Sequence, residues 1–240
     1  MDIRKTYLDL LKQKIEYAYD TQLDKIQKVA TMFGECMDNG GVVQLFAVKH
    51  GIEFANELNY RAGGIAPFHK QQLADMMIRH MCTKDEVYKT GEIYNRPEVY
   101  DQLTSLYELD DRDMYVLVSE RGNEPLILEY AKRAKAKGQK IVAVVNMKYY
   151  EKYGGTLLDY ADEYLDMQSE CPDLAVDIDG VKAGQTGTTV TNIIAQMLTA
   201  ELYKYFIEKH GSAPVLLSAN IKGADVHNNG LTDPYGKRVH

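Results

Sequence analysis

The chain has 240 residues, 45% of them hydrophobic, and a formal net charge of −7. This length and composition favour one domain with a substantial core and argue against a disordered chain. The negative charge argues against a nucleic-acid-binding protein, which needs a basic face. Since no apolar run approaches the roughly 20 residues of a membrane span and the charged N-terminus lacks a signal-peptide core, we expect a cytoplasmic protein without a membrane partner.

The first 40 residues are expected to form N-terminal helices. Leu8, Leu11, Ile15 and Ala18 recur at helical spacing, and either Asp20 or Thr21 could cap a second helical segment. The run Asn39-Gly40-Gly41 is typical of a helix end. An α/β core is then expected over residues 41–210, and an extended tail over residues 211–240, so that residues 1–240 form one domain.

The core begins with a buried strand at residues 42–48, which a helix at residues 51–61 follows. Residues 65–111 carry the weakest pattern, with helical fragments near residues 73–81 and 98–106. After the central unit described next, the pattern predicts a short helix at residues 156–160, short strands at residues 163–165 and 173–179, and a long helix at residues 188–210.

The most informative segment runs from Asp113 to Val145. Two apolar runs, residues 114–118 and 141–145, enclose a polar loop at residues 119–124 and a helical stretch. Near-continuous apolar strands of this kind indicate a parallel sheet covered on both faces. Ligands of such sheets bind at the carboxyl ends of the strands, and a helix N-terminus there favours an anion. We therefore expect the functional site near Ser119.

No sequence motif indicates a metal site or a disulfide framework. Cys36, Cys82 and Cys171 are scattered and odd in number, and neither a Cys-x-x-Cys pair nor a His-Glu-x-x-His motif is present. We expect no metal and no cofactor.

Four separated segments, in the right order, resemble the sugar isomerase (SIS) domain family, and in particular its stand-alone bacterial branch. They are residues 57–67, the strand and loop at Ser119, residues 184–189, and Ser218-Ala219-Asn220 followed by residues 225–228. The resemblance implies a flavodoxin-like three-layer α/β/α sandwich around a parallel sheet of about five strands. It also implies binding of a phosphorylated sugar and assembly as a homodimer or homotetramer with active sites near subunit contacts.

Two loops depart from the family pattern. Residues 46–51 carry Lys49 where a glycine is usual and Gly51 where a serine is expected, and the loop at Ser119 has Arg121 in place of a second serine. Either basic side chains replace hydroxyls at a phosphate, or the pocket accepts another anion such as a carboxylate; arginine suits both. The predicted ligand-binding residues are Lys49, Ser119, Arg121, Gly122, Asn123, Thr186 and Thr188.

An aldose–ketose isomerase needs a base that moves a proton between adjacent carbons, and a carboxylate or histidine can serve. The resemblance favours Glu57 or His50 as this base, with His227, from the same or a neighbouring subunit, as the acid that opens the sugar ring. Two alternatives stay open. Lyase (etherase-like) chemistry would use the same kind of base, and a non-catalytic sensor would bind the sugar phosphate without one.

Overall fold

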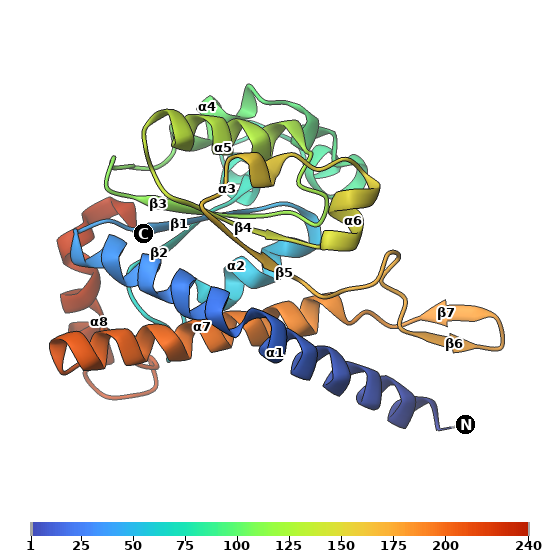
Figure 1. Cartoon of the computed structure of the whole chain (residues 1–240). Coiled ribbons are helices and arrows are strands. Elements are labelled where there is room, and N and C mark those ends of the chain that lie inside the picture. The colour runs from blue at the N-terminus through green and yellow to red at the C-terminus, as the bar shows by residue number, and fades with distance from the viewer. Residues whose placement is uncertain (1, 240) are drawn as a thin grey trace.

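Five parallel strands form the centre of the protein, which a computed structural model describes over residues 2–239 (Figure 1). Their order across the sheet is β2-β1-β3-β4-β5, and Val43 of β1 is in register with Phe68 of β2 and Met114 of β3. The strands are β1 (Val43–Ala47), β2 (Phe68–Gln71), β3 (Met114–Val118), β4 (Ile141–Val145) and β5 (Glu163–Asp166). This is the flavodoxin-like strand order, and the predicted fold class is confirmed.

Helices cover both faces of the sheet, which is why every residue of β1, β3 and β4 is buried. One face packs on α1 (Ile3–Asp38), α2 (Ile52–Leu58) and α7 (Gly187–His210). The other packs on α3 (Leu73–Ile78), α4 (Val99–Thr104) and α5 (Pro125–Ala136). Figure 1 shows these as layers below and above the sheet.

Shorter elements connect the layers. They are the helical turns η1 (Lys49–Gly51), η2 (Asp85–Thr90), η3 (Glu92–Asn95) and η4 (Leu157–Asp159), the helices α6 (Met147–Lys152) and α8 (Ala224–Thr232), the strands β6 (Val176–Ile178) and β7 (Val181–Ala183), and the last turn η5 (Asp233–Arg238). None of the helices within residues 2–239 is long and apolar enough to cross a membrane.

The N-terminal region is a single continuous helix, so the expected second cap near Asp20 and Thr21 is wrong. The Thr21 hydroxyl instead donates to the Tyr17 carbonyl oxygen one turn earlier (2.6 Å), a bond that lets threonine remain inside a helix. The helix ends as predicted: Asn39 is its C-cap, and Gly40 follows with a φ of 72°.

The edge strand β2 was not predicted from the sequence. Three of its four residues, His69, Lys70 and Gln71, are polar, so no apolar run marks it. Two of them are nevertheless buried, because they share a polar network with β1: His69 Nδ1 lies 2.9 Å and Gln71 Nε2 3.1 Å from Gln44 Oε1. Hydrogen bonding rather than hydrophobic burial defines this strand.

Two predictions for the last third of the chain need correction. The strand expected at residues 173–179 is β6, which pairs antiparallel with β7 in a separate hairpin outside the main sheet. The expected extended tail instead folds into α8 and η5. Ala224 and Thr232 are the buried residues of α8, so its sparse apolar pattern hid the helix.

Candidate functional site

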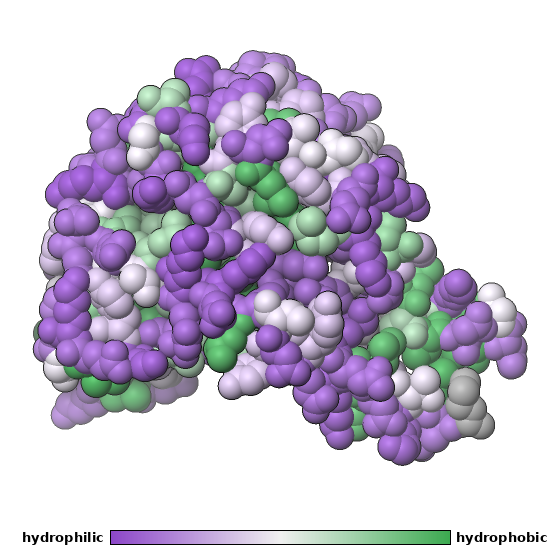
Figure 2. Space-filling view, viewed as in Figure 1, coloured by the Kyte–Doolittle hydropathy of each residue, from purple (hydrophilic) through white to green (hydrophobic). Residues whose placement is uncertain are grey.

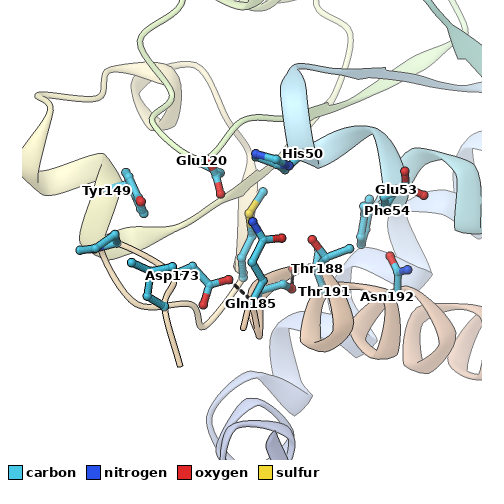
Figure 3. A pocket seen from close by; sticks show the side chains of 15 residues that line it. His50, Glu53, Phe54, Glu120, Tyr149, Asp173, Gln185, Thr188, Thr191 and Asn192 are labelled. Atoms are coloured by element: carbon cyan, nitrogen blue, oxygen red, sulfur yellow. Dashed lines mark hydrogen bonds between the residues drawn. The ribbon is translucent and has the colours of Figure 1, made fainter. Parts of the chain in front are cut away.

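The direction of strand order reverses between β1 and β3, the point at which ligands of such sheets bind. A cavity of about 220 Å³ lies at the carboxyl ends of these strands. Its walls come from the loop after β1, the first turn of α2, the loop after β3, the start of α6, the segment before α7 and the first turns of α7 (Figure 3).

His50 and Glu120 face each other at one side of this cavity (Figure 3). His50 belongs to η1, directly after β1, and Glu120 follows the last residues of β3. Burial raises the pKa of the Glu120 carboxyl above its ordinary value; Asp173 adds to this rise, and His50 opposes it. A cavity-facing carboxyl with a raised pKa beside an imidazole is the kind of arrangement found at acid–base sites.

The N-terminus of α7 holds a carboxylate of the same chain. Asp173 accepts hydrogen bonds from the Thr186 backbone N–H (3.1 Å), the Thr186 hydroxyl (2.9 Å) and the Gly187 backbone N–H (2.7 Å). Gly187 itself packs closely, since a Cβ there would lie 2.6 Å from the Cβ of Ser169. Asp173 therefore satisfies part of the positive end of a 24-residue helix.

The next positions of α7 remain open to a ligand. The helix forms its first internal bond from the Val190 N–H to the Thr186 carbonyl, so the N–H groups of Thr188 and Thr189 lack a carbonyl partner inside it. Thr188 lines the cavity, as does Asn192 one turn further on. The buried Oδ1 atom of Asn192 has no hydrogen-bond partner within residues 2–239.

His50 and Thr188 are the predicted site residues that line this cavity. Thr186 is fully buried beneath it, with its hydroxyl on Asp173. Ser119 is also fully buried: its hydroxyl donates to Glu124 Oε2 (2.5 Å) and accepts the Gly122 backbone N–H (2.8 Å). These bonds fix the turn that carries Glu120.

The other predicted anion-binding residues do not line the cavity. The Arg121 guanidinium lies over the Tyr153 ring, 4.3 Å from its centre, and Asn123 donates to the Tyr153 carbonyl oxygen (2.8 Å). Lys49 is exposed at the start of η1, with a φ of 52°. Gly122 accepts bonds from the start of the η4 segment through its carbonyl oxygen.

Two of the predicted catalytic residues are likewise absent from the cavity lining. Glu57 sits on the last turn of α2 and contacts Arg61 and Gln196. His227, on α8, has its Nε2 atom 2.9 Å from the Val215 carbonyl oxygen. A role for His227 at this cavity therefore requires that another subunit bring it there.

Glu53, Glu120, Asp173 and Asn192 line the cavity but were not among the predicted site residues. A partial signal was present, because Asn192 lies one turn after Thr188 on the predicted helix, and Glu53 lies three residues after His50. Asp173 had no such signal, since its role depends on a loop folding back onto α7.

The cavity is acidic. Its lining includes the carboxylates of Glu53, Glu120 and Asp173, the imidazole of His50, and no lysine or arginine among the described residues. Within residues 2–239, no group of three or more histidine, cysteine, aspartate or glutamate side chains is placed to hold a metal ion.

Known proteins resemble this chain in sequence and in fold. It is 31% identical to a UPF0309 protein of Caldanaerobacter subterraneus subsp. tengcongensis and 29% identical to one of Thermoanaerobacter pseudethanolicus, with 97% of both chains covered in each comparison.

Its fold is similar to that of a phosphoheptose isomerase from Francisella tularensis (TM-score 0.56, 15% identity, covering 84% of this chain and 96% of that one). It is also similar to the Vibrio vulnificus NanR protein complexed with ManNAc-6P (TM-score 0.53, 12% identity, 98% and 70% covered). The profile of the SIS domain matches residues 6–146. The chain therefore belongs to the SIS domain family.

Proposed function

We propose that this protein binds a sugar phosphate in the cavity and interconverts its aldose and ketose forms. The observation that carries the proposal is the pairing of Glu120 and His50 beside the N-terminus of α7, at the point where the strand order reverses. Membership of the SIS family and the fold shared with a phosphoheptose isomerase support this class of substrate.

The phosphate would bind at the start of α7. The free N–H groups of Thr188 and Thr189 and the positive end of the helix dipole favour an anion there. The Thr188 hydroxyl, which lines the cavity, adds a donor. The sugar carbons would then lie above α7, toward His50 and Glu120.

In the proposed reaction, Glu120 removes a proton from the carbon next to the carbonyl group. The electron pair of that C–H bond forms a carbon–carbon double bond, and the π pair of the carbonyl group moves to its oxygen, which gives an enediolate. The proton of the neighbouring hydroxyl group passes to that oxygen, so that the hydroxyl carbon becomes the new carbonyl carbon, while Glu120 returns its proton to the former carbonyl carbon. His50 donates a hydrogen bond to the oxygen on which negative charge develops. A raised pKa suits Glu120 to this work, because proton transfer is most efficient when the pKa of the base is near the working pH.

The test is proton exchange in deuterated water with a set of hexose and heptose phosphates, followed by NMR. Glu120→Gln keeps the shape of the side chain and should reduce exchange by roughly 10²- to 10⁴-fold while the ligand still binds. Glu57→Gln, one helical turn after Glu53 on α2 and outside the cavity lining, should retain exchange. Loss of exchange in Glu57→Gln but not in Glu120→Gln would overturn the assignment of Glu120 as the base.

Two other results would redirect the proposal. Binding of a sugar phosphate without any proton exchange would favour a non-catalytic sensor. Exchange accompanied by release of a substituent from the sugar would favour lyase chemistry.

A further inference from the structure

A second cavity lies beside the edge strand β2, between that strand and the η2 and η3 turns. Its volume is about 60 Å³, which exceeds the roughly 10–15 Å³ that one water molecule needs and leaves room for a ligand of a few heavy atoms. It shares no lining residue with the first cavity: His50 and Glu53 line the first, whereas Ala47 and Ile52 line the second. The reaction proposed above does not involve it.

Lys70, on β2, supplies the charge of this second cavity. Among the described residues that line it there is no other lysine, no arginine and no carboxylate. The Lys70 Nζ atom donates to Asn56 Oδ1 (2.5 Å), which is an uncharged acceptor. The ammonium group is therefore held in place by a neutral side chain and faces a cavity that offers it no counter-charge.

The carboxylates nearest to Lys70 are bound to other groups. Asp75 accepts a hydrogen bond from the Tyr107 hydroxyl (2.6 Å), and Glu53 accepts one from Asn56 Nδ2 (3.4 Å). Burial lowers the pKa of the Lys70 ammonium group, and the charges of Asp75 and Glu53 only partly oppose that shift. Partial burial of a charge without a charged partner costs free energy, and an anion in the cavity would offset this cost.

The remaining walls of the second cavity are largely apolar. Ala47 and Ile52 line one part of it, Val87 of η2 another, and the ring of Tyr94, whose residue is 3% exposed, a third. A phosphate ion would meet a single cation and apolar walls, which cannot satisfy four polar oxygen atoms. A ligand with one carboxylate group and a short hydrocarbon part matches both features of the lining.

We propose that the second cavity binds a small aliphatic carboxylate, whose charged group pairs with the Lys70 ammonium group while its hydrocarbon part lies against Ala47, Ile52 and Val87. A carboxylate accepts hydrogen bonds from an ammonium group, which has three donors. Because the two cavities share no lining residue, this inference stands or falls independently of the proposed function.

Ligand-observed NMR titration of the full chain at pH 7 with three probes tests the proposed chemistry. The probes are propionate, propionamide and inorganic phosphate. Propionamide has nearly the shape of propionate without its charge, so propionate should bind about tenfold more tightly. Inorganic phosphate should not displace propionate, because it is poorly matched to the apolar walls.

Three variants assign the binding to this cavity. Lys70→Met keeps most of the length of the side chain but removes the charge, and it should reduce the affinity for propionate about tenfold. Ala74→Leu keeps Lys70 but fills the cavity, which Ala74 lines, and it should prevent binding. Lys89→Met removes the same charge from an exposed position on η2 and should leave the affinity unchanged. Circular dichroism shows whether each variant is folded.

Several results would overturn the inference. Equal affinity for propionate and propionamide would show that the Lys70 charge is not used. Propionate binding that persists unchanged in Lys70→Met or in Ala74→Leu would belong to another part of the molecule. The absence of any propionate binding at tens of millimolar probe would show that the cavity holds no carboxylate.

Discussion

Arg238, near the end of the chain, forms an ion pair with Asp113 at the start of β3, and the Asp113 side chain is completely buried. Asp113 also accepts hydrogen bonds from the Val42 backbone N–H (2.9 Å) and from Gln44 Nε2 (3.0 Å). Arg238 in turn donates to the Gly40 carbonyl oxygen (3.1 Å). The C-terminal turn is thus attached to the amino ends of β1 and β3, opposite the cavity.

Replacing Arg238 with methionine should destabilise the protein strongly. Removal of one partner leaves the other charge buried without compensation, which typically costs about 3–5 kcal/mol. Urea unfolding of Arg238→Met measures the loss. Lys237→Met is the matched control, because the Lys237 side chain is exposed and its Nζ atom lies 4.0 Å from Glu108 Oε1. This variant should lose less than about 1 kcal/mol. Equal effects of the two variants would contradict a structural role for the buried pair.

The first half of α1 should pack against another copy of the chain. No residue between Ile3 and Tyr17 is buried, and Ala18 is the first that is. This half of α1 projects from the body beside the β6–β7 hairpin (Figure 1), and hydrophobic residues gather on the surface there (Figure 2). Leu8 is 48% exposed and Val181 of the hairpin is 67% exposed. Leu11 and Ile15 pack partly against the core, but the exposed side of this segment has no such contact. Because a helix gains most of its stability from packing of its apolar face, we expect a homodimer or larger oligomer that buries more than about 1,000 Å².

Light scattering at tens of micromolar protein checks the assembly. A mass of 27.2 kDa, that of one chain, would contradict it. Leu8→Glu combined with Val181→Glu should shift the protein toward the monomer, whereas Ile207→Glu, at an exposed position of α7, should not. An oligomer is also the condition under which His227 could reach a cavity.

Glu120→Gln should stabilise the protein at neutral pH. Burial raises the pKa of this carboxyl in the folded protein, so folding favours its protonated form. The stability that it contributes is present below its unfolded-state pKa and is lost as the pH rises through the folded-state value. The variant should therefore gain melting temperature relative to wild type at pH 7 and gain less at pH 4. An equal gain at both values would show that Glu120 is not desolvated.

Asp173→Asn should strengthen the binding of inorganic phosphate or a sugar phosphate. The substitution keeps an acceptor oxygen for the Gly187 N–H but removes a negative charge beside the proposed phosphate position. We expect a gain in affinity of up to about tenfold, equivalent to about 1.4 kcal/mol, measured by calorimetry at low salt. Asp177→Asn, on the exposed hairpin, is the control. A weaker complex in Asp173→Asn would show that the carboxylate supports ligand binding instead.

The local pattern of apolar, polar and turn residues was sufficient to predict much of the fold. The runs at residues 114–118 and 141–145 predict β3 and β4, because a strand covered on both faces must be apolar at every position. Asn39 and Gly40 predict the end of α1 through their backbone preferences. The sequence of the β6–β7 hairpin also contains a local turn pattern: Asp179-Gly180 stands between alternating apolar residues, which is typical of a hairpin turn. Asp179 and Gly180 both have a positive φ, as such a turn requires.

The cavity was partly predictable for a related reason. His50 lies shortly after the end of β1, and Thr188 lies in the first turn of α7. The topology of the sheet therefore brings both residues to its carboxyl edge. Glu120 was recognised as part of the loop, but its turn toward His50 depends on the buried Ser119–Glu124 hydrogen bond, which no spacing reveals.

Only the tertiary structure decided the contacts between separate segments of the chain. Asp173 reaches the start of α7 across 13 or 14 residues that include the hairpin, and Arg238 reaches Asp113 across 125. Sequence determines elements because hydrophobic period and backbone preference act over a few neighbouring residues. The charge of the cavity and the attachment of the C-terminus depend instead on how separate elements pack, and that packing is settled only when the whole core forms.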